Sequence, residues 1–204
     1  MTLERKIAKN LLEIKAVALR PNDYFTWTSG IKSPIYCDNR ITMSYPKIRR
    51  EIAAGLSEVI KKNYPEVEVV AGTATAGIPH AAWVSEVLDL PMIYVRDSAK
   101  KHGKTNQIEG RLLEGQKVVI IEDLISTGLS SLKVAKALEE AGAVVLGVVA
   151  IFSYELKKAQ DAFAADKVEY YTLTNYNFLI EEAVASNYIK QEDVEKLLEW
   201  RNNL

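Results

Sequence analysis

The sequence predicts an α/β fold in which helices flank a central parallel sheet, and two observations carry that prediction. Short segments rich in Val and Ile alternate with amphipathic helical segments along most of the 204 residues. This order gives a parallel sheet covered by helices. The short segments are also apolar at nearly every position, which is typical of strands buried on both faces. A chain of this length is expected to form one domain of generous size.

The helical segments are recognised by apolar residues that recur every three or four positions. Leu3, Ile7 and Leu11 predict a first amphipathic helix. Pro46 suits the first turn of a second helix, which we expect to run to about Asn63. The other expected helices are residues 78–88, 130–140, 155–164, 178–186 and 191–202. The expected strands are residues 67–71, 92–95, 118–121, 143–151 and 168–173.

Two segments have no apolar period. Residues 21–45 carry Pro and Gly and are expected to be irregular, although short strands fit within them. Residues 96–114 are polar and include five cations, which are Arg96, Lys100, Lys101, Lys104 and Arg111. One interpretation of this second segment is a solvated linker. The other is a mobile lid that closes over an anionic substrate.

Composition narrows the classes of partner. With 48% hydrophobic residues, 26% charged residues and a net charge of −1, the chain has no global field that would attract nucleic acid or an anionic membrane. Cys37 is the only cysteine, which excludes an internal disulfide and a Cys-rich metal site. With only His80 and His102, a His-based zinc site is not expected either. No apolar run suits a signal peptide or a membrane span, so the expected location is the cytoplasm.

The polar residues after the strand at 118–121 are the main candidate site, because open parallel sheets bind ligands beyond the carboxyl ends of their strands. Residues 126–130 supply hydroxyls, a glycine and backbone N–H groups just before a helix, which suits a phosphate. Glu122 and Asp123 precede them, and carboxylates accept strong hydrogen bonds from sugar hydroxyls. A ribose phosphate matches both features.

A plain helix cap and turn is the alternative for the same residues. Two other nucleotide-binding classes are disfavoured, because neither a complete P-loop pattern nor a Gly-x-Gly-x-x-Gly follows a strand.

Residues 118–130 read Val-Val-Ile-Ile-Glu-Asp-Leu-Ile-Ser-Thr-Gly-Leu-Ser and resemble the signature of type I phosphoribosyltransferases. Three further segments are similar to the orotate phosphoribosyltransferase family, and the likeness extends over nearly the whole chain. They are Thr-Ser-Gly-Ile-Lys-Ser-Pro-Ile-Tyr (28–36), residues 72–79, and Arg-Asp-Ser-Ala-Lys-Lys-His-Gly (96–103). The last resembles the catalytic loop of that family, which purine phosphoribosyltransferases do not share.

The resemblance implies the type I phosphoribosyltransferase fold as a single domain over 1–204, with a small hood from about residues 1–45 and a mobile catalytic loop. It implies transfer of ribose 5-phosphate from phosphoribosyl diphosphate (PRPP) to orotate, giving orotidine monophosphate and pyrophosphate in pyrimidine (UMP) biosynthesis. Magnesium is implied as the cofactor, held mainly through substrate oxygens rather than by protein ligands. A homodimer is implied too, in which each catalytic loop reaches the neighbour's site.

The same resemblance gives individual residues their expected roles. Lys100 and Asp123 are the expected catalytic residues. Ser126 and Tyr36 are expected to contact orotate, although a core tyrosine is an alternative for Tyr36. The expected PRPP contacts are Arg96, Lys100, His102, Glu122, Asp123, Leu124, Ile125, Ser126, Thr127, Gly128, Leu129 and Ser130.

This chain also lacks cations that are common in the family. We hypothesise that Lys101 and Lys104 compensate for them. The positions where many members carry lysine or another cation are Thr28, Ala76, Asp97 and Tyr154.

Two rival functions remain open at this point. One is a phosphoribosyltransferase specific for a purine or uracil, against which the loop at 96–103 argues. The other is a non-catalytic regulator of the same fold, which would have no need of Lys100 and would usually add a DNA-binding module.

Overall fold

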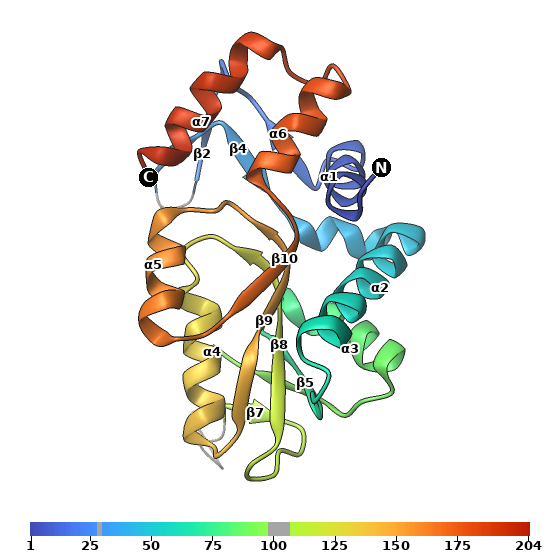
Figure 1. The fold of residues 1–204 in the computed structure, drawn as a ribbon. Coiled ribbons are helices and arrows are strands. Elements are labelled where there is room, and N and C mark those ends of the chain that lie inside the picture. Colours follow the sequence, from blue (N-terminus) through green and yellow to red (C-terminus); the bar gives the residue numbers. More distant parts are fainter. Residues whose placement is uncertain (28–29, 98–106) are drawn as a thin grey trace.

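The structure is a computed structural model that describes residues 1–27, 30–97 and 107–204. Its centre is a six-stranded sheet in the order β10-β9-β8-β5-β6-β7, and Figure 1 shows this sheet running through the middle of the molecule. Five strands are parallel, as predicted, and β7 is an antiparallel edge strand. The strands are β5 Val69–Thr73, β6 Met92–Val95, β7 Ile108–Glu109, β8 Lys117–Ile125, β9 Val144–Ser153 and β10 Tyr170–Asn175.

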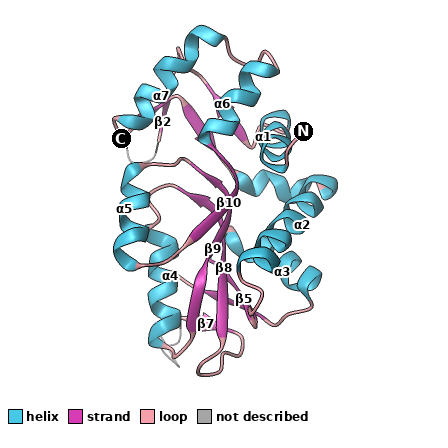
Figure 2. Ribbon diagram, in the orientation of Figure 1, coloured by secondary structure: helices cyan, strands magenta, loops and turns pink. Residues whose placement is uncertain are grey.

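Helices cover both faces of this sheet, because successive strand residues point to opposite sides. Val119 and Ile121 of β8 belong to one buried cluster, together with residues of α2 and α3. Val118 and Ile120 belong to a second cluster, together with residues of α4 and α5. Figure 2 shows the two pairs of helices on opposite sides of the strands. These helices are α2 Pro46–Asn63, α3 Gly77–Leu88, α4 Leu129–Glu140 and α5 Lys157–Asp166.

A further group of elements lies at the carboxyl end of the sheet, where β10 runs directly into α6 (Figure 1). It combines the start of the chain with its last helices. Its helical elements are α1 Leu3–Glu13, η1 Asn39–Ser44, α6 Tyr176–Ala185, η2 Gln191–Asp193 and α7 Val194–Asn202. Its strands form two small antiparallel pairs, β1 Val17–Leu19 with β4 Ile35–Cys37 and β2 Phe25–Thr26 with β3 Lys32–Ser33. The division into one domain with a hood from residues 1–45 stays a prediction.

The main departure from the expected elements concerns β8. The strand was expected to end at residue 121, before the acidic pair, but it continues to Ile125. Leu124 and Ile125 pair with Phe152 and Ser153 of β9, which itself ends two residues later than expected. Backbone hydrogen bonds between β8 and β9 continue beyond the acidic pair. The polar side chains of this pair therefore do not end the strand.

Other differences are local. Residues 155 and 156 were expected to be helical, but Glu155 has a φ of 54° and α5 begins at Lys157. The Ser153 hydroxyl accepts a hydrogen bond from the Glu155 backbone N–H at 2.9 Å, which stabilises this turn. The expected helix at 191–202 is divided into η2 and α7. The irregular segments at 21–45 and 96–114 contain β2, β3, β4, η1 and β7.

The start of α3 packs directly on β8, and glycine permits this contact. A Cβ atom on Gly77 would lie 2.5 Å from the carbonyl oxygen of Ile121. A Cβ atom on Gly72 in β5 would lie 3.0 Å from the Cα of Ile78. Close packing at both positions fixes the turn 73–76 against the end of β8, which brings the turn beside Glu122.

We predict that Gly77→Ala lowers the free energy of unfolding by about 1–3 kcal/mol, because the new methyl group meets a rigid backbone carbonyl. Gly55→Ala is the matched control, since Gly55 is also helical and its Cβ would meet only flexible Leu side chains at 3.3 Å. The control should gain helix propensity and keep or increase stability. Denaturant unfolding of both variants checks this, and equal stability of the two would contradict the close contact.

Candidate active site

Two loops meet at the carboxyl end of the sheet and enclose a cavity of about 260 Å³, called here the donor cavity. One loop follows β5 and the other follows β8, and these two strands are neighbours in the sheet. The residues that line the cavity are Thr73, Ala74, Thr75, Ala76, Glu122, Asp123, Leu124, Ser126, Thr127, Gly128 and Ser130. The sequence prediction therefore found the β8 side of this cavity but not the β5 side.

In the donor cavity Glu122 is buried, Asp123 is partly buried, and both are held by hydrogen bonds. Glu122 is 4% exposed, and its carboxylate accepts hydrogen bonds from the hydroxyls of Ser130 at 3.3 Å and Ser131 at 3.1 Å. The backbone N–H of Asp123 donates to the other Glu122 oxygen at 3.0 Å. The Asn39 amide donates to the Asp123 carbonyl at 2.7 Å, so that η1 also positions this residue.

Burial is the dominant influence on the titration of both carboxyl groups. It raises the pKa of Glu122 to about 8, and the negative charge of the neighbouring Asp123 contributes in the same direction. Burial also raises the pKa of Asp123, while hydrogen bonds to its carboxylate and the charge of Arg40 oppose the shift. None of the described residues that line the cavity is cationic. The two acids therefore face a site that contains hydroxyls and backbone groups.

The start of α4 provides the second feature of the donor cavity. Gly128 caps the helix with a φ of 77°, and within the described ranges no side chain caps the first N–H groups of the helix. A Cβ atom on Gly128 would lie 2.6 Å from the ring of Phe163, so glycine is needed for both conformation and space. Together with the hydroxyls of Ser126 and Thr127, the free helix N-terminus forms a site suited to a phosphate.

A second cavity of about 220 Å³, called here the acceptor cavity, adjoins the first. The two cavities share Leu124 and Ser126. The residues lining the acceptor cavity are Trp27, Tyr36, Cys37, Leu124, Ser126 and Tyr154. Three aromatic rings on its walls suit a flat heterocycle, because aromatic faces stack on planar rings.

The structure brings together most of the predicted site residues. Glu122, Asp123, Leu124, Ser126, Thr127, Gly128 and Ser130 line the donor cavity, and Tyr36 and Ser126 line the acceptor cavity. Tyr36 is 46% exposed, so it is no core residue.

Three predicted contacts lie apart from the cavities. The side chain of Ile125 is buried in the core, and Leu129 is 59% exposed. Arg96 forms an ion pair with Glu109 of β7 at 3.4 Å. The predicted roles of Lys100 and His102 fall on residues outside those that the structure describes.

Sequence reasoning missed seven residues that line the cavities, of which Ala74, Thr75 and Ala76 form the turn after β5. Thr73 of β5 lines the donor cavity, and its buried hydroxyl has no hydrogen-bond partner among the described residues. Trp27, Cys37 and Tyr154 come from segments that are far apart in the sequence. The available signals were the positions of Ala76 and Tyr154, which were noted only as lost cations.

The raised pKa of Glu122 predicts a dependence of stability on pH. The folded protein keeps this proton up to about pH 8, whereas an unfolded chain releases it near 4.5. Between these values the folded state binds more protons, so its stability falls as the pH rises. Glu122→Gln has no carboxyl group to titrate, so we expect it to lose less stability as the pH rises. Between pH 5 and 8 the Tm of the wild type should fall further than that of the variant, by on the order of 5 °C.

Thermal unfolding across that pH range measures the effect. Glu58→Gln, on an exposed part of α2, is the control and should follow the wild-type profile. Parallel profiles for wild type and Glu122→Gln would show that burial of Glu122 does not govern this pH range.

Comparison with known proteins agrees with this geometry. Residues 44–187 match the phosphoribosyl transferase domain family. An orotate phosphoribosyltransferase from Listeria innocua is 63% identical over 203 residues, which covers 100% of this chain and 97% of that protein.

Two solved structures are also similar. The orotate phosphoribosyltransferase from Aeropyrum pernix aligns with a TM-score of 0.77 and 27% identity, covering 90% of this chain and 99% of that one. A UMP synthase from Leishmania donovani aligns with a TM-score of 0.83 and 27% identity, covering 98% of this chain and 42% of that one. The predicted type I phosphoribosyltransferase fold is confirmed, and the chain belongs to the orotate phosphoribosyltransferase family.

Proposed function

We propose that this protein transfers the ribose 5-phosphate group from PRPP to a ring nitrogen of orotate and releases pyrophosphate, a step of pyrimidine (UMP) biosynthesis. The observation that carries the proposal is the junction of the two cavities at Leu124 and Ser126. One cavity is acidic and hydroxyl-lined, and the other is aromatic. The family membership at 63% identity supports the same reaction.

The donor cavity holds the ribose phosphate. The carboxyl groups of Glu122 and Asp123 bind the ribose hydroxyls, because a carboxyl group accepts hydrogen bonds from hydroxyls whether or not it holds a proton. The 5-phosphate binds the loop 126–130 and the N-terminus of α4, where hydroxyls and backbone N–H groups converge. Held in this way, the anomeric carbon faces the acceptor cavity through the shared wall.

The acceptor cavity holds orotate as a flat ring. Trp27, Tyr36 and Tyr154 provide aromatic surface, and the Ser126 hydroxyl provides a polar contact at the junction. Because Ser126 also lines the donor cavity, it contacts both partners of the reaction. This arrangement holds the ring nitrogen close to the anomeric carbon, which favours the displacement.

Magnesium is the proposed cofactor. Among the described residues there is no cluster of three or more His, Cys, Asp or Glu side chains that could hold a metal ion alone. The donor cavity instead offers two carboxyl groups and the unpartnered hydroxyl of Thr73, and such oxygens suit an ion that substrate and water mainly coordinate. When bound, magnesium neutralises charge on the pyrophosphate group.

Charge develops in opposite directions during the transfer. The ribose becomes positive, which Asp123 and Glu122 stabilise, and the departing pyrophosphate becomes more negative. We assign the pyrophosphate to Arg96, Lys100 and His102. Because Arg96 is paired with Glu109, its binding to pyrophosphate requires this ion pair to open or to be shared.

The proposed assembly is a homodimer in the cytoplasm, with each catalytic loop serving the neighbouring site. No helix in the described ranges combines the length and apolar character that crossing a bilayer requires. We propose no nucleic-acid partner, in keeping with the balanced charge of the chain.

Orotate consumption with PRPP and magnesium tests the proposed function. We expect turnover by the wild type, loss of turnover when magnesium is chelated, and a decrease of about 10²–10³-fold in kcat for Lys100→Ala, since a loop cation stabilises the leaving group. Lys62→Ala in the last turn of α2 is the control for removal of a lysine. Wild-type protein that uses adenine or uracil but not orotate would refute the assignment.

A mixture of two inactive variants tests the shared site. In a two-fold dimer of Lys100→Ala and Asp123→Asn subunits, one of the two sites would combine both intact residues, so roughly a quarter of wild-type activity should return in an equal mixture. Exchange of subunits by dilution and concentration precedes the assay. Activity no higher than that of the separate variants would show that each site uses its own loop.

A further inference from the structure

One wall of the acceptor cavity is formed by Trp27, and this side chain is held from three directions. Its indole N–H donates to the carbonyl of Ile35 at 3.0 Å. Its ring lies 5.6 Å from that of Tyr154, which forms another part of the wall. On a further side it meets the ring of Trp200 at 5.9 Å in an edge-to-face arrangement. Trp200 does not line the acceptor cavity itself.

Trp200 lies on α7 and connects this helix to the start of the chain. Its indole N–H donates to the carbonyl of Lys32 at 3.0 Å. Lys32 belongs to β3, whose partner strand β2 ends one residue before Trp27. Trp200 therefore contacts the ring of Trp27 and also holds the strand pair β2–β3 next to it.

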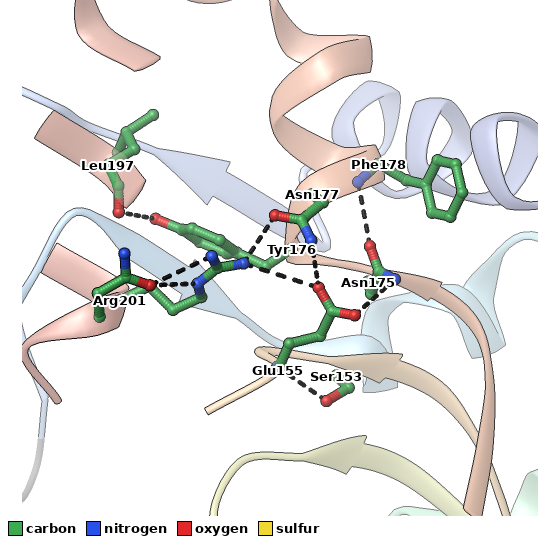
Figure 3. A network of polar contacts seen from close by, with 9 residues as sticks. Ser153, Glu155, Asn175, Tyr176, Asn177, Phe178, Leu197 and Arg201 are labelled. Carbon is green, nitrogen blue, oxygen red and sulfur yellow. Dashed lines mark hydrogen bonds and ion pairs between the residues drawn. The ribbon is translucent and has the colours of Figure 1, made fainter. Parts of the chain in front are cut away.

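A polar network fixes α7 relative to the acceptor cavity (Figure 3). Arg201 forms an ion pair with Glu155 at 3.7 Å and donates to the Asn177 side chain at 2.7 Å. Asn177 and Asn175 donate to the two carboxylate oxygens of Glu155 at 2.7 and 3.0 Å. The Tyr176 hydroxyl adds a hydrogen bond to the Leu197 carbonyl of α7 at 3.1 Å.

These contacts form a closed ring of five residues. Glu155 follows Tyr154 in the chain, and Arg201 follows Trp200. The ion pair joins Glu155 to Arg201. Trp27 joins their chain neighbours, because its ring contacts both Tyr154 and Trp200. Figure 3 shows Glu155 and Arg201 facing each other from the turn after β9 and from α7.

We propose that Trp200, with Glu155 and Arg201, forms a positioning set that holds Trp27 and Tyr154 in the shape that binds the acceptor base. This proposal rests on the assignment of the acceptor cavity to orotate. The three residues line neither the donor cavity nor the acceptor cavity, and they act through the two aromatic wall residues. Removing any one link leaves the walls in place but widens their motion, which weakens binding of the base.

The donor cavity is independent of this ring. Its described lining residues come from the turn after β5 and from residues 122–130, and none belongs to the positioning set. A defect in the set should therefore raise the KM for orotate while the KM for PRPP is unchanged. A merely structural role would reduce the fraction of active enzyme, and thus the apparent kcat, with both KM values unchanged.

Steady-state kinetics with both substrates tests the proposal in the intact enzyme, below the unfolding temperature of each variant. We expect Trp200→Leu to raise the orotate KM about tenfold and Arg201→Gln to raise it about threefold, with the PRPP KM and kcat within twofold of wild type. Arg201→Lys keeps the charge beside Glu155 and should recover part of the loss. The double variant should raise the KM by less than the product of the single effects, because both residues act through one ring of contacts.

Two control variants match these changes. Glu192→Gln breaks an exposed ion pair with Lys190 in the same C-terminal stretch. Trp83→Phe alters a tryptophan that packs on His80 and Arg49, outside both cavities. Both controls should keep the wild-type KM for orotate.

The outcomes separate this proposal from the proposed function. If the wild type converts orotate but Trp200→Leu keeps its KM, or raises both KM values equally, the positioning set is refuted and the function stands. If the wild type uses another base, the orotate assignment fails. The KM for that base then decides whether the set positions the acceptor walls.

Discussion

Burial of two adjacent carboxyl groups at the end of β8 is the constraint on which the site depends. Glu122 and Asp123 lie along the part of β8 that pairs with β9, and Glu122 is 4% exposed. The backbone N–H of Asp123 donates to the Glu122 side chain and its carbonyl accepts from the Asn39 side chain. Burial disfavours the charged form of both and raises the pKa of each, and for Glu122 the negative charge of Asp123 adds to the effect. The seryl hydroxyls on α4 and the Asn39 amide hold the pair in place without supplying a positive charge. The site is thus prepared for a ligand that brings hydroxyl donors and positive charge, as a ribose with developing cationic character does.

The same constraint bears on how a highly charged substrate binds at a donor cavity whose described lining has no cationic side chain. Its described lining contains backbone N–H groups, hydroxyls and two acids. Phosphate binding at a helix N-terminus needs no cationic side chain. Any further neutralisation of the pyrophosphate has to come from magnesium or from cations that do not line the cavity. Among the described cations, Arg40 acts on Asp123, and the predicted contact Arg96 is engaged with Glu109. The site therefore separates two tasks, with fixed dipoles for the 5-phosphate and separate positive charges for the leaving group.

Features that depend on local interactions were predicted from the sequence, and features that depend on distant segments were not. The five parallel strands and most helices were predictable, because buried strands are apolar throughout and helices repeat every three or four residues. The extension of β8 was not, since it depends on pairing with β9, whose residues lie about 30 positions later. The turn at Glu155 depends on one hydroxyl of Ser153. For the site, residues 122–130 were found because they are contiguous and carry a motif. Thr73, Trp27 and Tyr154 were missed because only the fold brings them to the same place.

This difference between the two cavities has a physical consequence. The β8 side of the donor cavity is built on one strand and one helix, so its shape follows from the core of the sheet. The acceptor cavity shares Leu124 and Ser126 with the donor cavity, but its other walls come from Trp27 after β2, from β4 and from the turn after β9. Two- and three-residue strand pairs have few hydrogen bonds, so side-chain contacts must fix their positions. Trp200 and the Glu155–Arg201 pair provide those contacts from the other end of the chain. Selectivity for the base therefore depends on how firmly α7 is held, whereas binding of the ribose phosphate does not.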